Sequence, residues 1–230
     1  MERRGALEPD LVDYPESDGR PMAESDMHQA EMISILEVLR AHFAAGPGPA
    51  YVAGNNFLYW ERGNPRAAVS PDVYVVKGVE PGLRKTFKVW EEGGRTPSFV
   101  LEVTSDSTRH EDLGAKMTRY RDDLRVPEYF LFDLEGDWIP EHLRGYRLDG
   151  EVYERVSALP GGRLLSQELG LELGLLDGHL RFFLPGDAAP LPTAAEQLGQ
   201  ERQRAASAEA EVVRLRAELE RLRGGGSSGA

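Results

Sequence analysis

Two short apolar segments of the chain each contain one carboxylate. Residues 70–76 (SPDVYVV) place Asp72 at the edge of the first segment, and residues 99–104 (FVLEVT) place Glu102 inside the second. Both segments are too short for a helix and rich in β-branched residues, which predicts buried strands. A buried ionised acid is costly unless it meets a cation, a hydrogen-bond network or a proton. Two such acids on neighbouring strands would suit Mg²⁺, which one or two carboxylates can hold together with waters and a substrate phosphate.

The segment after Glu102 carries three more polar residues at a regular spacing. Asp112, Lys116 and Tyr120 stand four apart, so a helix would place them on one face. A lysine beside a metal-bound phosphate can orient or deprotonate the attacking water or neutralise charge in the transition state, and a tyrosine supplies a hydroxyl donor. Asp112 precedes Lys116 in the favourable order for a helical ion pair and could hold its ammonium group.

The elements that must position these residues can be read from the apolar periodicity and the Gly and Pro breaks. They predict a fold of the α/β (α+β) class with one central mixed sheet. The expected order is a helix at 22–44, strands at 51–53 and 57–60 that could form one bent hairpin, the Asp72 strand, the Glu102 strand, a polar helix at 106–124 and a strand at 129–132.

Further strands are expected beyond this core. Asp149-Gly150 lies between two alternating segments, which predicts a hairpin with a type I′ turn. Residues 171–176 and 179–184 indicate additional short strands.

The last part of the chain has a different character. Thr193 and Glu196 form a capping box that predicts the start of a long helix. Positions 198, 205, 212 and 219, and positions three after each, form a heptad pattern that is weak at its start and stronger at its end. The pattern fits either a coiled coil that makes a homodimer through 193–223 or a solvated or back-docked helix. The expected domains are an arm at 1–20, a folded domain at 21–188, the helix at 189–223 and a flexible tail at 224–230.

Composition limits the classes of protein. The chain has 230 residues, no cysteine and a formal net charge of −12. The lack of cysteine excludes disulfides, thiolate zinc sites and a cysteine nucleophile, as is common in the reducing cytosol. No apolar run approaches the roughly 20 residues that span a bilayer, so we expect a cytoplasmic protein without a membrane partner. The acidic balance argues against tight nonspecific binding to DNA, although bound metal would offset part of it.

Taken together, these segments resemble the Uma-two family of bacterial restriction-endonuclease-like proteins, which belongs to the PD-(D/E)XK nuclease superfamily. The resemblance covers roughly residues 14–186. It rests on SPDV at 70–73, FVLEVTS at 99–105, Asp112, Lys116, Tyr120, and VPEYFLFD at 126–133. The family resemblance implies a core of a helix, three strands, a helix and a strand, and a metal-dependent endonuclease that uses Mg²⁺ or Mn²⁺ on DNA.

The resemblance also implies roles for individual residues. Asp72 and Glu102 resemble the two metal-binding acids, with the Val103 carbonyl as a third ligand. Thr104 stands where the superfamily has a lysine, and the family variant supplies that lysine from the next helix, which makes Lys116 the candidate. Glu24 resembles an extra acid that some relatives add to the metal site.

Each of these residues also has a structural interpretation. Asp72 could simply open a strand or cap a turn, and Tyr120 could be a packed helix residue. The lone His28 is expected to pack or hydrogen-bond near Glu24 rather than bind metal. The remaining expectations concern surface residues: His110, His142, Lys85 and Lys88, the two lysines being solvated or in contact with a phosphate backbone. The rival function is a catalytically weak nuclease-fold scaffold that binds partners through its C-terminal coiled coil.

Overall fold

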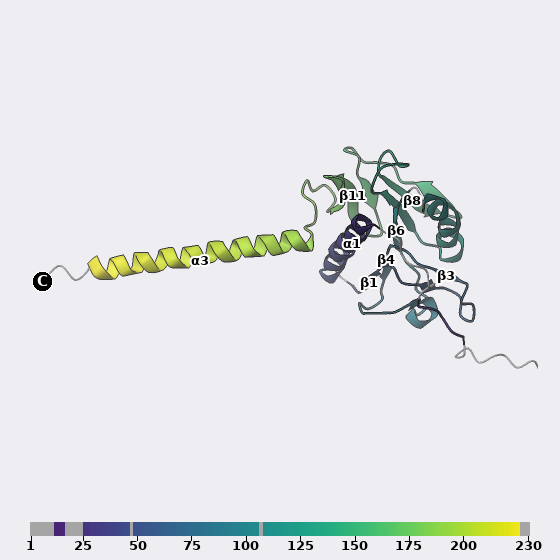
Figure 1. Ribbon diagram of the computed structural model, residues 1–230, viewed down its shortest axis with the longest axis horizontal. Coiled ribbons are helices and arrows are strands. Elements are labelled where there is room, and N and C mark those ends of the chain that lie inside the picture. The colour runs from purple at the N-terminus through teal and green to yellow at the C-terminus, as the bar shows by residue number, and fades with distance from the viewer. Residues whose placement is uncertain (1–11, 17–24, 47, 106–107, 226–230) are drawn as a thin grey trace, which may run out of the picture. The chain divides into compact units, whose positions relative to one another are not determined.

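The computed structural model describes residues 12–16, 25–46, 48–105 and 108–225 (Figure 1). Its backbone divides into two compact units, Met1–Leu191 and Pro192–Ala230, which are described separately. Glu24 and most of the expected arm at 1–20 lie outside the described residues.

A six-stranded mixed sheet forms the centre of the first unit. Strands β6 (Phe99–Thr104) and β7 (Glu128–Asp133) run parallel, and the other neighbouring pairs are antiparallel. The predicted α/β class with a central mixed sheet, extra strands and a C-terminal helix is therefore confirmed. The strand order is β1 (Ala50–Ala53), β4 (Val73–Lys77), β6 (Phe99–Thr104), β7 (Glu128–Asp133), β8 (Leu143–Asp149) and β9 (Val152–Arg155).

Two three-stranded sheets accompany the central one. The first has the order β10 (Leu164–Ser166), β11 (Leu171–Leu176) and β12 (His179–Phe183), and the second has the order β3 (Ala68–Val69), β2 (Leu58–Tyr59) and β5 (Phe87–Lys88). The bent hairpin considered for residues 51–60 is wrong, because β1 and β2 belong to different sheets. At Gly54 the chain passes so close to the Asp72 carbonyl that a Cβ would lie 1.8 Å from its oxygen, and Asn55 has a positive φ of 54°. This bend directs the chain out of the central sheet.

Side chains of the central strands alternate between two cores. Helix α1 (Asp26–Ala44) contributes to the core that contains Leu101 and Val103 of β6, while Val100 belongs to the core on the other face. Because successive strand residues point to opposite faces, Glu102 shares the face of Val100. That face is covered by the helical segment that follows β6, which includes the buried Tyr120.

The helical segment after β6 is wider than an ordinary α-helix. It begins as α2 (Arg109–Glu111), continues as the π-helical turns η3 (Asp112–Lys116) and η4 (Arg119–Asp123), and replaces the regular helix expected at 106–124. A short 3₁₀ segment, η2 (Val89–Glu92), lies between β5 and β6. Wide turns inside helices are frequent at functional sites.

The hairpin expected at Asp149-Gly150 forms between β8 and β9, with Asp149 paired to Val152. Its turn is not type I′. Gly150 has a positive φ of 58°, but Glu151 does not. Type I′ needs a positive φ at both central residues. Asp149 is still a paired strand residue, so glycine takes the first turn position. A different Asp-Gly pair, Asp177 and Gly178 between β11 and β12, has φ values of 54° and 81° and meets the type I′ requirement.

The second unit is built on one long helix, α3 (Ala194–Gly225). Its predicted capping box is confirmed. The Thr193 amide donates to Glu196 Oε2 at 2.8 Å, and the Glu196 amide donates to Thr193 Oγ1 at 3.3 Å. In the part of the chain that the structure describes, α3 and the other helices are too short or too polar to cross a membrane.

Candidate active site

The two predicted acids lie opposite each other, Asp72 directly before β4 and Glu102 inside the neighbouring strand β6. Val73 pairs with Leu101 in the antiparallel register, which places Asp72 across from Glu102. The Asp72 amide donates to Glu102 Oε2 at 3.2 Å, and the Val103 amide donates to Asp72 Oδ2 at 2.8 Å. The structure therefore brings Asp72 and Glu102 together on one face, as their positions in the two segments predict.

Glu102 is the centre of the hydrogen-bond network. Its side chain is fully buried, and both carboxylate oxygens accept hydrogen bonds. The Tyr120 hydroxyl donates to Oε1 at 2.5 Å, and Lys116 Nζ donates to Oε2 at 3.0 Å. The ammonium donor makes the second bond charge-assisted, which is the stronger class of hydrogen bond.

Lys116 bridges two carboxylates. Its ammonium nitrogen also lies 3.2 Å from Asp112 Oδ1, so the predicted helical ion pair is present. Asp112 Oδ2 accepts a hydrogen bond from the Thr104 hydroxyl at 2.7 Å, so Thr104 supports the position of this carboxylate. Asp112 Oδ1 is buried and receives no hydrogen bond from the described residues.

Electrostatics in this cluster favour a proton or an added cation. The pKa of Glu102 is raised to about 8, chiefly by burial and also by the nearby Asp72 and Asp112, against the attraction of Lys116. Burial acts to lower the pKa of Lys116, but Glu102 and Asp112 outweigh it and raise this pKa above its ordinary value. Three carboxylates therefore share one ammonium group, which leaves the cluster with excess negative charge when all are ionised.

A cavity of about 310 Å³ opens onto this cluster. Asp72, Asp112 and Lys116 line it, while Glu102 lies behind them. The wall also includes residues from the start of α1, the end of β6 and the loop after β7: Ser25, His28, Val103, Thr104, Ser105, Thr108, Leu134 and Glu135. The cavity gives a small ligand access to two of the three acids.

Comparison with known proteins identifies the family. Residues 4–179 match the Uma2 family model, which carries the description "Putative restriction endonuclease". The chain belongs to the Uma2 family. A crystal structure from Anabaena variabilis ATCC 29413, titled as a "putative nuclease belonging to DUF820", is similar to this Uma2 chain with 15% identity and a TM-score of 0.43, covering 65% of this chain and 82% of that one. None of the curated proteins in the comparison matches this chain.

The position of His28 was not foreseen for this Uma2 chain. Its Nε2 lies 3.5 Å from Asp72 Oδ2, and the ring lines the cavity. The expected contact with Glu24 lies outside the described residues. A signal was present in the sequence, because His28 precedes Met32 and Ile35 by four and seven residues and so occupies the buried face of α1. A polar ring on that face needs a polar partner, and Asp72 supplies it.

The other singled-out residues of the Uma2 chain take no part in the cluster. Lys85 pairs with Glu16 at 3.0 Å and Lys88 with Glu91 at 3.2 Å. His110 is exposed, as expected. His142 is half-buried, with Nδ1 2.9 Å from the Asp133 carbonyl oxygen, because the chain folds back there at a positive φ of 59°.

The donor set fits a hard divalent cation. The cavity wall offers Asp72 and Asp112, both of them oxygen ligands, and the buried Asp112 Oδ1 is in ionic contact with Lys116 at 3.2 Å but accepts no hydrogen bond from the described residues. Across the described ranges, no group of three or more His, Asp and Glu side chains is placed so that it could hold a metal ion. Mg²⁺ commonly uses one or two carboxylates and completes its shell with waters and phosphate, so a group of three such side chains is not required.

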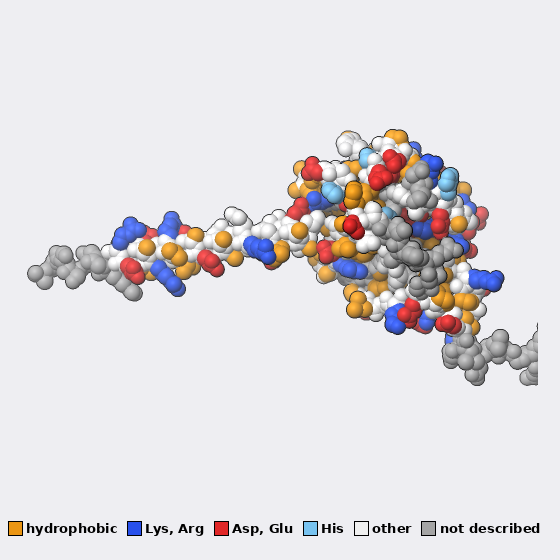
Figure 2. Space-filling model, in the orientation of Figure 1, with side chains coloured by type: hydrophobic (Ala, Val, Ile, Leu, Met, Phe, Trp, Pro, Cys, Tyr) orange, Lys and Arg blue, Asp and Glu red, His pale blue; other side chains and the backbone are white. Residues whose placement is uncertain are grey.

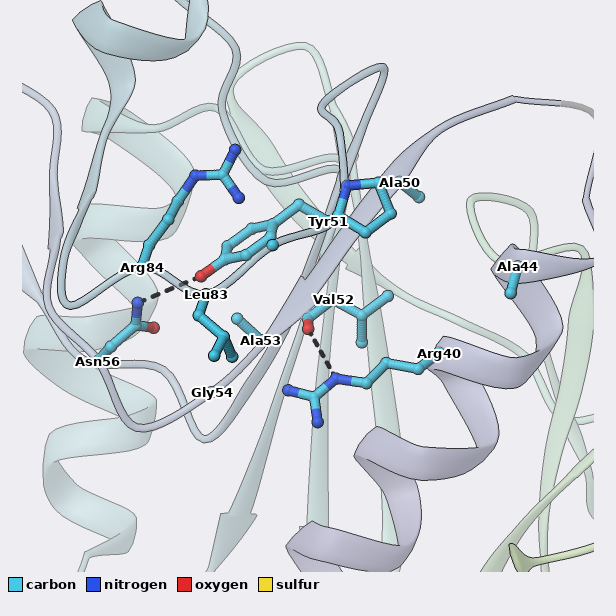
Figure 3. A pocket seen from close by; sticks show the side chains of 12 residues that line it. Arg40, Ala44, Ala50, Tyr51, Val52, Ala53, Gly54, Asn56, Leu83 and Arg84 are labelled. Atoms are coloured by element: carbon cyan, nitrogen blue, oxygen red, sulfur yellow. Dashed lines mark hydrogen bonds between the residues drawn. The ribbon is translucent and has the colours of Figure 1, made fainter.

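A second cavity of about 580 Å³ follows edge strand β1 of the Uma2 chain (Figure 3). None of the described residues that line it is an acid. Arg40 donates to the Val52 carbonyl at 3.1 Å, and the Arg84 guanidinium lies 4.3 Å from the centre of the Tyr51 ring. The end of β1 at Gly54 touches Asp72, so a basic cavity and an acidic cavity adjoin the same strand end.

Proposed function

We propose that this chain is a divalent-metal-dependent endonuclease that hydrolyses phosphodiester bonds in DNA. The observation that carries the proposal is the pair of opposed strand acids, Asp72 and Glu102, with Lys116 at 3.0 Å from Glu102 beside an open cavity. Membership of the Uma2 family supports a nuclease that acts on nucleic acid. The acid and lysine residue types are those that phosphodiester hydrolysis needs.

Asp72 and Glu102, together with the Val103 carbonyl, are the residues that would hold Mg²⁺ or Mn²⁺. Such a cation supplies a Lewis acid and lowers the pKa of a bound water. The Val103 amide fixes the Asp72 carboxylate through Oδ2, and Asp72 lines the open cavity from which a cation would enter. Glu24 remains a proposed additional acid outside the described residues.

In the proposed enzyme, Lys116 acts as a fixed positive charge. Its raised pKa keeps the amine protonated near neutral pH. A protonated amine favours charge stabilisation or proton donation over general-base catalysis. Asp112 holds the ammonium from the other side at 3.2 Å. Tyr120 is fully buried and donates to Glu102, so we assign it a positioning role rather than contact with the substrate.

A second candidate function is a catalytically weak scaffold that keeps the nuclease fold. The formal charge of −12 and the mutual pairing of Glu102, Lys116 and Asp112 favour it, because the cluster is already internally satisfied in part. In this alternative the chain acts through self-association of residues 193–223. Self-association and a cytoplasmic location are part of both proposals.

Metal titration distinguishes the two functions. Calorimetric titration of Mn²⁺ into the wild type should show binding that both Asp72→Ala and Glu102→Ala abolish. Glu111→Ala is the matched control, since it removes an exposed acid from the same helical segment. The same proteins are then assayed for nicking of supercoiled plasmid. Unchanged binding in the two site variants contradicts the site, and binding without nicking on DNA or RNA favours the scaffold.

A further inference from the structure

Helix α3 carries a stripe of apolar residues along its heptad pattern. Every described side chain of the helix is exposed. Orange side chains lie among charged ones along α3 in Figure 2. Four of its larger apolar residues occupy positions a and d of the heptad pattern, which form the seam of a coiled coil, and keep about half of their surface exposed: Leu198 at 48%, Val212 at 46%, Leu215 at 46% and Leu219 at 54%. Val213, at 67%, lies outside the seam at position b.

We propose that two copies of this chain pair along α3 as a parallel coiled coil with equal residues side by side. In a parallel pair, a g residue of one helix faces the e residue of the next heptad on the other helix. Arg204 then faces Glu209 of the second copy, and Glu211 faces Arg216 of the second copy. By symmetry each attractive pair occurs twice.

An antiparallel pair with full overlap is disfavoured by the same residues. There e faces e and g faces g, so Arg202 meets Arg216 and Glu209 meets its own copy. The g positions give one attractive pairing, Arg204 with Glu218, but place Glu211 against itself. Like charges at these flanking positions suppress the wrong orientation, which is how e and g residues select partners in coiled coils.

The layers of the seam support the parallel arrangement as well. Leu215 and Leu219 meet their own copies and form an apolar end, while the small Ala205 and Ala208 meet theirs. In the antiparallel alternative, Leu219 would face Glu201 and bury an acid against leucine. The parallel pair brings Glu201 next to its own copy, which weakens only the amino-terminal end of the seam.

The orientation of the two α3 helices decides at which end of the helix pair each Uma2 domain is attached. Each Uma2 domain precedes α3 in the chain, so a parallel pair receives both domains at the same end. Helix α3 has 32 residues. An antiparallel pair would therefore separate the two entry points by the whole helix length, about 48 Å at a rise of about 1.5 Å per residue. Joint action of two sites on the two strands of a duplex, which rests on the proposed function, therefore needs the parallel form.

A cysteine cross-link tests this orientation in the full chain, which has no cysteine of its own. Ala205→Cys places a thiol at an a position, where two copies meet within disulfide distance only in the parallel form. In the antiparallel form these two residues would be about 15 Å apart along the axis. Ala206→Cys is the matched control, one residue away at position b.

Under mild oxidation, Ala205→Cys should become mostly disulfide-linked dimer and Ala206→Cys should stay largely unlinked. Equal linkage of the two variants, in a protein that sediments as a dimer, overturns the parallel register. A monomeric mass by sedimentation overturns the pairing itself. Mn²⁺ titration of the same variants reports the nuclease site separately, so loss of either result leaves the other proposal intact.

A charge exchange gives a second readout without cysteine. Glu211→Arg creates two repulsive contacts with Arg216 in the parallel pair. It should raise the dissociation constant of the dimer by roughly tenfold. Adding Arg216→Glu restores opposite charges and should return the constant to within about twofold of the wild type. Glu211 also pairs with Arg214 of its own helix at 2.6 Å, so helicity is followed by circular dichroism. Failure of the double variant to recover overturns the proposed pairing.

Discussion

Two buried glutamates on neighbouring strands show how differently this molecule treats a carboxylate. Glu102 on β6 is 0% exposed and Glu128 on β7 is 1% exposed, so burial does not separate them. Glu102 shares one ammonium group with Asp72 and Asp112. Glu128 is the only carboxylate in its described network and accepts hydrogen bonds from a full set of donors: the Arg147 guanidinium, the Ser166 hydroxyl and the amides of Gln167 and Glu168.

The difference lies in charge balance and access. Donors surround Glu128 on the side of β8 and the β10 to β11 turn, so its charge is compensated and it ties three segments together. Glu102 lies in a cluster with more acids than cations, and that cluster borders a cavity of about 310 Å³. An uncompensated acid group beside a cavity indicates a ligand site, whereas a compensated one indicates a structural contact.

The largest expected effect follows from exchanging each glutamate for its neutral isostere. Glu102→Gln should reduce plasmid nicking by about a thousandfold, because it removes a metal-binding carboxylate. Glu128→Gln should leave nicking per folded molecule within about threefold of the wild type. The assay is nicking normalised to the folded fraction measured by circular dichroism. Equal losses in both variants would contradict the distinction between the two glutamates.

For the free energy of unfolding, by contrast with nicking activity, we expect a large effect from replacing Glu128. Glu128→Ala leaves Arg147 without its carboxylate and the Ser166 hydroxyl without an acceptor, which should lower the free energy of unfolding by about 3 kcal/mol. Urea denaturation at pH 7 measures this change. Glu168→Ala, which loses only a surface ion pair with Lys77, is the control. It should cost less than about 1 kcal/mol. A Glu128→Ala variant as stable as this control would show that the network is not structural.

The pH dependence of the free energy of unfolding should show the contribution of the Glu102 proton. Its pKa in the folded chain, about 8, is above that of the unfolded chain, so the folded state holds this proton more tightly. The resulting stability is fully present below about pH 4.5 and is lost as pH rises through about 8. Between pH 6 and pH 8 the wild type should lose roughly 2 kcal/mol more than Glu102→Gln, as measured by urea denaturation. Parallel pH profiles for the two proteins would show that Glu102 does not hold the proton.

The smallest effect is expected at the positioning residue. Tyr120→Phe removes the hydroxyl donor to Glu102 Oε1 and should lower nicking by about tenfold, with Mn²⁺ affinity reduced by less than that. Tyr153→Phe is a control in which another tyrosine loses its hydroxyl hydrogen bond, here the one donated to the Val126 carbonyl. A site tyrosine that changes stability but not activity would have a packing role alone.

Local sequence determined most of the elements and the main site residues. Short β-branched segments placed Glu102 on a strand and Asp72 at the start of another, a four-residue spacing aligned Lys116 and Tyr120, and a capping box marked the start of α3. These features depend on neighbours within a few residues, and such patterns are visible in the chain itself.

Only the tertiary structure decided how the residues are paired. The register of β4 against β6 set Asp72 against Glu102, the start of α1 brought His28 to Asp72, and a bend at Gly54 separated β1 from β2. The sequence pattern alone could not separate Glu102 from Glu128, because each is an acid in an apolar strand. Their partners lie 14 to 40 residues away along the chain. Packing brings such partners together, and local periodicity carries no information about them.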